Sequence, residues 1–274
     1  MIPVLVVNLK RSTARRSAIT ARLDALGIKH RFFDAVDGRS LSPDELERLA
    51  PQSALLLDRK LTPGEIGAGA SHIAAIRQLV DENHDFACVM DDDAVPFTDA
   101  PLFLDPEALN SLPQFDVLRL VSDPARWKRP SWQIAQLHGH GIYAMARAGF
   151  GCQGQVYSRA GLLKMASQLS VVTAPADFMF YHDGHVRGLR IVEVRPGVIE
   201  HDQLDRYPEL QAALSDVGLR PAPDRRTMAF SERLRRRRLR YRRKLMAARS
   251  FIRAWGIGGL FRILWWWPPG SYFR

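Results

Sequence analysis

Cysteine is scarce in this sequence, and long apolar runs are missing. Cys88 and Cys152 are the only cysteines among 274 residues. Two are too few for a disulfide framework, so we expect two reduced, buried thiols. No run of 18 apolar residues occurs, and no secretory leader precedes the strand-like residues 2–7. The sequence therefore argues against a secreted domain held by disulfides and against a membrane-spanning helix. It predicts a protein that stays on the side of the membrane where it is made.

Acidic residues are nearly missing from the last fifth of the chain. Residues 225–274 hold 15 Lys and Arg against one acid, Glu232, whereas residues 1–224 hold 24 basic and 28 acidic residues. The formal net charge of +10 therefore comes entirely from the C-terminal segment. We predict two parts, a globular domain over residues 1–224 and a basic, Trp-rich helical tail over residues 225–274.

Within residues 1–224, short apolar runs alternate with amphipathic stretches, which is typical of an α/β domain. Thr62 as cap, Pro63 in the first position and Glu65 in the third predict the start of a helix. Residues 142–145 and 154–157 predict a hairpin or two edge strands. The other expected strands cover residues 4–9, 30–33, 86–90, 116–121 and 189–194, and the expected helices cover residues 13–26, 44–49, 66–80 and 160–169.

Three consecutive aspartates, Asp91, Asp92 and Asp93, follow the apolar run at residues 86–90. Like charges this close repel one another, and a bound divalent cation would relieve the repulsion. Carboxylate oxygens suit Mg²⁺ or Mn²⁺, which can bridge the phosphates of a nucleoside diphosphate. The carboxyl edge of an α/β sheet is also where ligands usually bind. A helix cap or a solvated turn is the alternative interpretation.

Five blocks of the sequence occur in a specific order and spacing. They are residues 6–12 with Arg15 and Arg16, residues 32–35 with Asp37 and Gly38, residues 61–67 with Ser71 and His72, residues 89–93, and residues 175–177 with residues 194–196. In this combination they resemble glycosyltransferase family 25. That family includes bacterial lipooligosaccharide galactosyltransferases and collagen hydroxylysine galactosyltransferases.

The resemblance implies a GT-A-type α/β fold with a mixed central sheet over residues 1–224. It implies a nucleotide-sugar donor, most often UDP-galactose, and inverting transfer of a hexose to a glycan such as lipooligosaccharide. It also implies that Asp91 and Asp93 hold the divalent ion. The residues that it assigns to the donor are Asn8, Arg11, Arg16, Glu65, His72, Asp91 and Asp92.

The sequence departs from the usual family pattern at three points. Asp91 replaces a usual Glu, which still permits metal binding, and Ala68 replaces a usual Cys. Residues 151–155, Gly-Cys-Gln-Gly-Gln, stand where the family often has Gly-Thr and then an aromatic residue. These departures bear on the donor sugar and the acceptor rather than on the reaction class.

An inverting transfer needs a base that removes the acceptor hydroxyl's proton as the oxygen attacks the anomeric carbon. Asp177 is the predicted base, because it stands in the otherwise apolar residues 175–181. A helix N-cap is its alternative role. His201, which follows the last expected strand, is the predicted additional metal ligand, and a surface turn is the alternative.

The tail combines clustered arginines with clustered tryptophans. Residues 235–238 are four consecutive arginines, and residues 265–267 are three consecutive tryptophans. A basic helix followed by a Trp-rich segment too short to span is typical of the surface of an anionic bilayer. A solvated tail, packing on the body or on a partner, and nucleic-acid binding remain alternatives. We therefore expect a peripheral protein on the cytoplasmic face of the membrane that acts on a lipid-linked or surface glycan.

Overall fold

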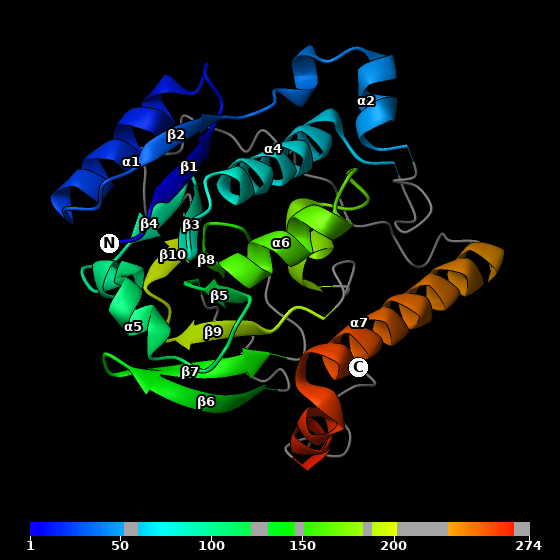
Figure 1. Cartoon of the computed structure of the whole chain (residues 1–274). Coiled ribbons are helices and arrows are strands. Elements are labelled where there is room, and N and C mark those ends of the chain that lie inside the picture. The colour runs from blue at the N-terminus through cyan, green and yellow to red at the C-terminus, as the bar shows by residue number, and fades with distance from the viewer. Residues whose placement is uncertain (52–59, 122–130, 146–150, 183–187, 202–229, 266–274) are drawn as a thin grey trace.

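The computed structural model describes residues 1–51, 60–121, 131–145, 151–182, 188–201 and 230–265. An eight-stranded mixed sheet has the order β2-β1-β3-β8-β5-β9-β7-β6, and β10 pairs with β4 in a second sheet (Figure 1). The strands are β1 (Val4–Asn8), β2 (Arg31–Asp34), β3 (Phe86–Asp91), β4 (Ala94–Pro96), β5 (Val117–Arg119), β6 (Ser131–Leu137), β7 (His140–Met145), β8 (Gly154–Ser158), β9 (Ile191–Arg195) and β10 (Ile199–His201). The helices are α1 (Thr13–Ala25), η1 (Gly38–Ser40), α2 (Pro43–Leu49), α4 (Pro63–Asp81), η2 (Ala100–Leu104), α5 (Pro106–Asn110), α6 (Arg159–Gln168), η4 (Phe178–His182) and α7 (Phe230–Trp265).

Two helices begin with capping boxes that are encoded locally. Thr62 accepts a hydrogen bond from the N–H of Glu65, whose carboxylate accepts one from the Thr62 N–H in return. Ser42 and Glu45 make the same exchange at the start of α2. Each exchange satisfies two N–H groups that have no partner within the helix. The predicted start of α4 is confirmed.

The sheet lies between two helical layers. Alternate side chains of each strand point to opposite faces, so each face of the sheet packs its own core against helices. On one face, Val89 and Tyr157 belong to a core with residues of α4 and α6. On the other face, Val6 and Met90 belong to a core with residues of α1, η2 and α5. The expected α/β fold with a mixed central sheet is therefore confirmed.

The hairpin or edge-strand prediction for residues 142–145 and 154–157 is wrong. β8 lies inside the sheet, antiparallel to both β3 and β5. β7 pairs instead with β9 and with β6, a strand that the sequence patterns did not predict. A periodic pattern reports which face of a strand is buried but not which strand lies beside it.

The strand directions bring several polar residues to one edge of the sheet. β1 runs parallel to β2 and β3, and β5 runs parallel to β9. Because β8 is antiparallel to both β3 and β5, these two groups of strands point the same way. Their carboxyl ends therefore share one edge, which we call the carboxyl edge. Its strand-terminal residues are Asn8, Asp34, Asp91, Arg119 and Arg195.

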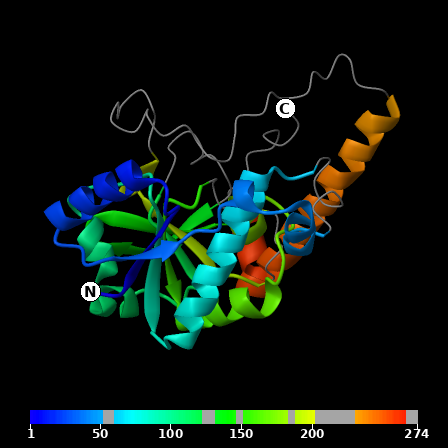
Figure 2. The same ribbon diagram turned by 90° about the horizontal axis from the view of Figure 1, so that it is seen from above.

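The C-terminal helix α7 packs against the body near its end and projects beyond it at its start (Figures 1 and 2). The helix is broken at Gly256, which has φ +69°. Phe251 and Trp255 meet the Trp132 ring of β6 edge-on, at ring-centroid distances of 5.8 and 5.4 Å. Packing on the body, one of the alternatives for the basic segment, is thus observed for this part of α7. Among the described helices, none is long and apolar enough to cross a membrane.

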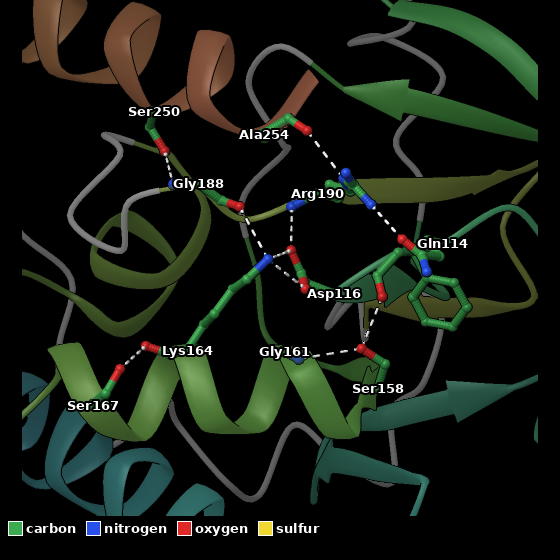
Figure 3. A network of polar contacts seen from close by, with 11 residues as sticks. Gln114, Asp116, Ser158, Gly161, Lys164, Ser167, Gly188, Arg190, Ser250 and Ala254 are labelled. Carbon is green, nitrogen blue, oxygen red and sulfur yellow. Dashed lines mark hydrogen bonds and ion pairs between the residues drawn. The ribbon is translucent and has the colours of Figure 1, made fainter. Parts of the chain in front are cut away.

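Polar contacts also join α7 to the body (Figure 3). The Ser250 hydroxyl accepts a hydrogen bond from the Gly188 N–H at 3.1 Å, and the Ala254 carbonyl accepts one from Arg190 Nε at 3.0 Å. The backbone N–H of Arg190 donates to the buried Asp116 carboxylate at 2.7 Å. Lys164 of α6 donates to both oxygens of this carboxylate. Asp116 therefore connects β5, α6 and the segment that holds α7.

Candidate active site

β1 and β3 end side by side at the carboxyl edge, where Val7 is paired with Asp91. Asn8 Nδ2 donates to Asp92 Oδ2 at 2.6 Å, and Arg15 Nε lies 3.4 Å from the same oxygen. Both Asn8 and Asp92 are buried. Two of the predicted donor residues therefore bond to each other, and their contact fixes the turn that follows β3.

Asp91 is held by a histidine of the neighbouring helix. His72 of α4 places Nε2 2.9 Å from Asp91 Oδ1. The His72 ring is buried, and it meets the Phe180 ring edge-on at 5.8 Å. Its Nδ1 atom is buried and makes no hydrogen bond within the described part of the chain. His72 thus restricts the orientation of the Asp91 carboxylate.

The predicted arginines lie beyond the ends of β1 and β2. Arg11 Nε is 2.6 Å from Asp37 Oδ2, and this hydrogen bond lowers the pKa of the Asp37 carboxyl against a small opposing effect of burial. The Arg16 guanidinium lies 4.0 Å from the centroid of the Phe32 ring and 3.8 Å from Asp34. Both guanidinium groups are partly exposed, so they add positive charge at the carboxyl edge.

Glu65, another residue predicted to bind the nucleotide-sugar donor, caps the start of its own helix. Its carboxylate accepts the Thr62 N–H at 2.8 Å as part of the capping box. The first turn of α4 packs closely on η1, since a Cβ atom added to Gly38 would lie 1.8 Å from the Pro63 carbonyl oxygen. Glu65 therefore contributes to the position of the helix that carries His72.

Asp177 joins the site through the segment that precedes β8. Its Oδ2 accepts a hydrogen bond from the Gly151 N–H at 3.1 Å, and its Oδ1 accepts one from the Phe178 N–H at 2.9 Å. The neighbouring Cys152 thiol has a strongly raised pKa, first because it is buried and then because Asp91, Asp177 and Asp93 act on it electrostatically. The structure thus brings these three aspartates within electrostatic reach of one buried atom.

The sequence patterns missed a set of buried polar residues on β5, β8 and β9. Arg119 is 1% exposed, donates to the Gly151 carbonyl at 3.1 Å, and places Nε 3.7 Å from Glu193. Glu193 also accepts a hydrogen bond from Arg195 at 2.9 Å. A signal was present, since a single charged residue interrupts each of the apolar runs 117–121 and 191–194. Such residues are buried only when they are paired.

The described residues do not by themselves form the predicted metal site. Among the described residues, no three His, Cys, Asp or Glu side chains form a group that could hold a metal ion. His201 pairs through its backbone with Ala94, next to Asp93, but its side chain lies outside the described part. Magnesium-type ions usually take one or two carboxylates together with substrate phosphates rather than a complete protein cage. By ligand chemistry, Asp91 and Asp93 fit such an ion.

Comparison with known proteins assigns the family. Residues 1–180 match the family described as glycosyltransferase family 25 (LPS biosynthesis protein). The chain belongs to glycosyltransferase family 25. The matched region includes both ends of the site, from Asn8 to Asp177, so the residues around Cys152 lie within the part that defines family 25.

Relatives of this chain occur in bacteria and animals. A putative glycosyltransferase from Haemophilus influenzae is 26% identical over 205 residues, which are 72% of this chain and 69% of the relative. A glycosyltransferase 25 family member from Aedes aegypti is 34% identical over 95 residues, 33% of this chain and 16% of that protein. Human procollagen galactosyltransferase 2 is 30% identical over 95 residues, and only 15% of its length is covered.

Solved structures align more distantly. Galactosyltransferase LgtC in complex with donor and acceptor sugar analogs has a TM-score of 0.36 at 11% identity, over 81% of this chain and 98% of that chain. A glycosyltransferase involved in glycosylation of the major capsid of PBCV-1 has a TM-score of 0.39 at 9% identity, over 77% and 99%. Similarity at this level does not assign a subclass of fold, so the GT-A type stays a prediction.

Proposed function

We propose that this family 25 member is an inverting, GT-A-type glycosyltransferase that moves a hexose to a glycan such as a lipooligosaccharide core. The proposed hexose is galactose, and the proposed donor is UDP-galactose. The observation that supports this best is the end of β3, where His72 holds Asp91 at 2.9 Å and Asn8 holds Asp92 at 2.6 Å. These residues lie at the carboxyl edge of the sheet, where α/β proteins usually bind nucleotides. The relation to a protein named procollagen galactosyltransferase 2 supports galactose as the first sugar to try.

In this proposal the end of β3 receives the diphosphate of the donor. Asp91 and Asp93 would hold Mn²⁺ or Mg²⁺, which when bound stabilises the negative charge that grows on the departing diphosphate. His72 keeps Asp91 in orientation through the 2.9 Å contact. Arg11 and Arg16 lie at the adjacent strand ends, beside Asp37 and Asp34, and their guanidinium groups have further donors that can bind phosphate oxygens.

Asp177 is the proposed base. It accepts the proton of the acceptor hydroxyl, whose oxygen bonds to the anomeric carbon while the bond from that carbon to the phosphate oxygen breaks and UDP leaves. Both Asp177 oxygens already accept backbone N–H groups, from Gly151 and Phe178. These bonds hold the carboxylate in place, and each oxygen keeps a second lone pair for the acceptor hydroxyl.

The test is release of UDP from a panel of UDP-sugars by the full chain with Mn²⁺, with and without glycan acceptors. We expect turnover with at least one donor and a loss of about 100-fold or more in Asp93→Ala. Asp24→Ala, on the exposed side of α1, is the matched control and should keep wild-type turnover. Silence with every donor, or equal turnover in Asp93→Ala, would contradict the proposal.

We further propose that α7 holds the enzyme on the cytoplasmic face of an anionic membrane. On the side away from Phe251, Tyr241 and Leu245 are 55% and 53% exposed. Arg238 and Arg249 are exposed on the same face by helical spacing. Apolar and aromatic side chains next to arginines suit the headgroup region, where each basic residue contributes about 1 kcal/mol. The Trp-rich residues 266–274 lie outside the described part.

Flotation of the full chain with vesicles tests this second proposal. We expect binding to vesicles that contain phosphatidylglycerol, weaker binding to phosphatidylcholine alone, and reduced binding of a Tyr241→Ser, Leu245→Ser double variant. The control is Leu163→Ser, which changes an exposed leucine on α6. Retention of duplex DNA without any retention of anionic vesicles would support the nucleic-acid alternative instead.

A further inference from the structure

Two glutamines beside Asp91 have buried oxygen atoms that lack a partner. Gln155 is 0% exposed and Gln153 is 5% exposed. The Oε1 atom of each is buried and accepts no hydrogen bond within the described part of the chain. Burying a carboxamide oxygen without a donor is costly, so such atoms are rare in folded proteins and call for an explanation.

The register of the sheet places both glutamines on the face that carries Asp91. Gln155 of β8 is paired with Val89 of β3 on one side and with Arg119 of β5 on the other. Asp91 follows Val89 by two residues, and Gln153 precedes Gln155 by two, just before β8 begins; side chains two apart share a face. His72 contacts Asp91 from the helix that packs on this face. Both glutamines therefore lie next to the proposed diphosphate position.

The local backbone holds these amides in place. Gln155 Nε2 lies 3.5 Å from the Gly151 carbonyl, which also accepts the Arg119 guanidinium at 3.1 Å. Gly151 has φ +91°, and a Cβ atom there would lie 2.1 Å from Gln153 Oε1. The positive φ favours glycine at this position, and a larger residue would force the Gln153 amide to move.

The chemistry of the unpartnered atoms selects the ligand group. A carboxamide oxygen accepts hydrogen bonds, so it would repel a phosphate oxygen but bind a hydroxyl. The hexose of a UDP-sugar is attached directly to the diphosphate, and its hydroxyls are neutral donors. A sugar held beside the end of β3 would lie next to the acceptor oxygens of Gln153 and Gln155.

We propose that Gln153 and Gln155 accept hydrogen bonds from hydroxyls of the donor hexose and thereby select which hexose is transferred. This inference rests on the proposed function. It makes both residues determinants of sugar specificity rather than of UDP binding. It also implies that the ligand-free protein carries a stability cost at these atoms that a bound sugar removes.

The experiment compares UDP, UDP-galactose and UDP-glucose by calorimetry with Mn²⁺, together with thermal melting of the ligand-free protein. The variants are Gln155→Leu and Gln153→Leu, with Gln136→Leu on the exposed side of β6 as the control. UDP affinity should stay within about threefold of wild type. The gain in affinity from the preferred sugar should fall about 5- to 10-fold in each of the two variants, as expected for one lost hydrogen bond.

Melting separates a binding role from a structural one. Leucine removes an unpartnered buried oxygen and loses only the long contact from Nε2 to the Gly151 carbonyl, at 3.5 Å. Gln155→Leu should therefore melt at the same temperature as wild type or higher when no ligand is present. A lower melting temperature together with weaker UDP binding would show a structural role and overturn the inference. Unchanged preference between the two sugars would also overturn it, as would a raised acceptor KM with unchanged donor affinity. If wild type bound UDP-sugars no better than UDP and turned none over, the proposed function itself would fail.

Discussion

Replacing Asp116 by alanine should destabilise the fold more than most single surface substitutions do. This buried carboxylate joins β5 to α6 and to the segment that holds α7. Asp116 is 3% exposed and accepts Lys164 Nζ at 2.9 and 2.7 Å and the Arg190 N–H at 2.7 Å (Figure 3). Losing the acceptor of the Arg190 N–H costs about 1–3 kcal/mol. The ion pair adds about 1 kcal/mol at most, since the Lys164 side chain is 40% exposed. We therefore expect a loss of about 1–4 kcal/mol in the free energy of unfolding.

Urea unfolding followed by far-ultraviolet circular dichroism measures this loss. The matched control is Asp105→Ala, which removes the carboxylate that accepts the Ala108 N–H at the start of α5 and should cost about 1 kcal/mol. A second readout follows from Arg190, whose guanidinium holds the Ala254 carbonyl. Proteolysis should cut α7 faster in Asp116→Ala than in Asp105→Ala. Equal stability of the two variants would refute the claim that Asp116 joins β5 to α6 and to the segment that holds α7.

Three further predictions rest on separate features. Gly38→Ala should lower the free energy of unfolding by about 3 kcal/mol or more, because the new Cβ meets the Pro63 carbonyl. Gly27→Ala, with φ +65° and no atom within 4 Å of the new Cβ, should cost about 1 kcal/mol. Urea unfolding measures both costs, and equal costs would contradict the packing argument. Burial raises the pKa of both cysteine thiols, so neither should react with a disulfide reagent at pH 8 until the protein unfolds, and rapid labelling of the native chain would count against it. Arg11 lowers the pKa of Asp37 below its ordinary 3.8, so the ion pair's small contribution to stability is present above pH 3.8 and is lost as the pH falls through the folded pKa. Arg11→Ala should raise the Asp37 pKa in an NMR titration, and an unchanged pKa would exclude the ion pair.

The parts of the fold that the sequence predicted well are those determined locally. The start of α4 follows from Thr62, Pro63 and Glu65, which are neighbours in the chain and cap the helix together. β3 follows from a short apolar run that ends in aspartates. Local caps and periodic burial depend on residues only a few positions apart, so they can be read without knowing the tertiary structure.

The parts that escaped prediction depend on distant partners. The contact of Asp177 with Gly151 and the burial of Arg119 beside Glu193 exist only because β5, β8 and β9 are adjacent in the sheet. Strand order is not encoded in the period of any one strand, so the pattern of residues 154–157 predicts part of a hairpin or an edge strand where the fold has a central strand. The docking of α7 likewise depends on Trp132, which lies on a strand that the sequence patterns did not predict.

The central claim is that the carboxylates after β3 hold a divalent ion against the diphosphate of a nucleotide. The most direct measurement is calorimetric titration of UDP into the full chain, with Mn²⁺ and then with EDTA, for wild type, Asp93→Ala and Asp105→Ala. The account predicts binding with Mn²⁺ that weakens about 100-fold or more in EDTA and in Asp93→Ala, while Asp105→Ala behaves as wild type. UDP binding of equal strength under all these conditions would contradict it.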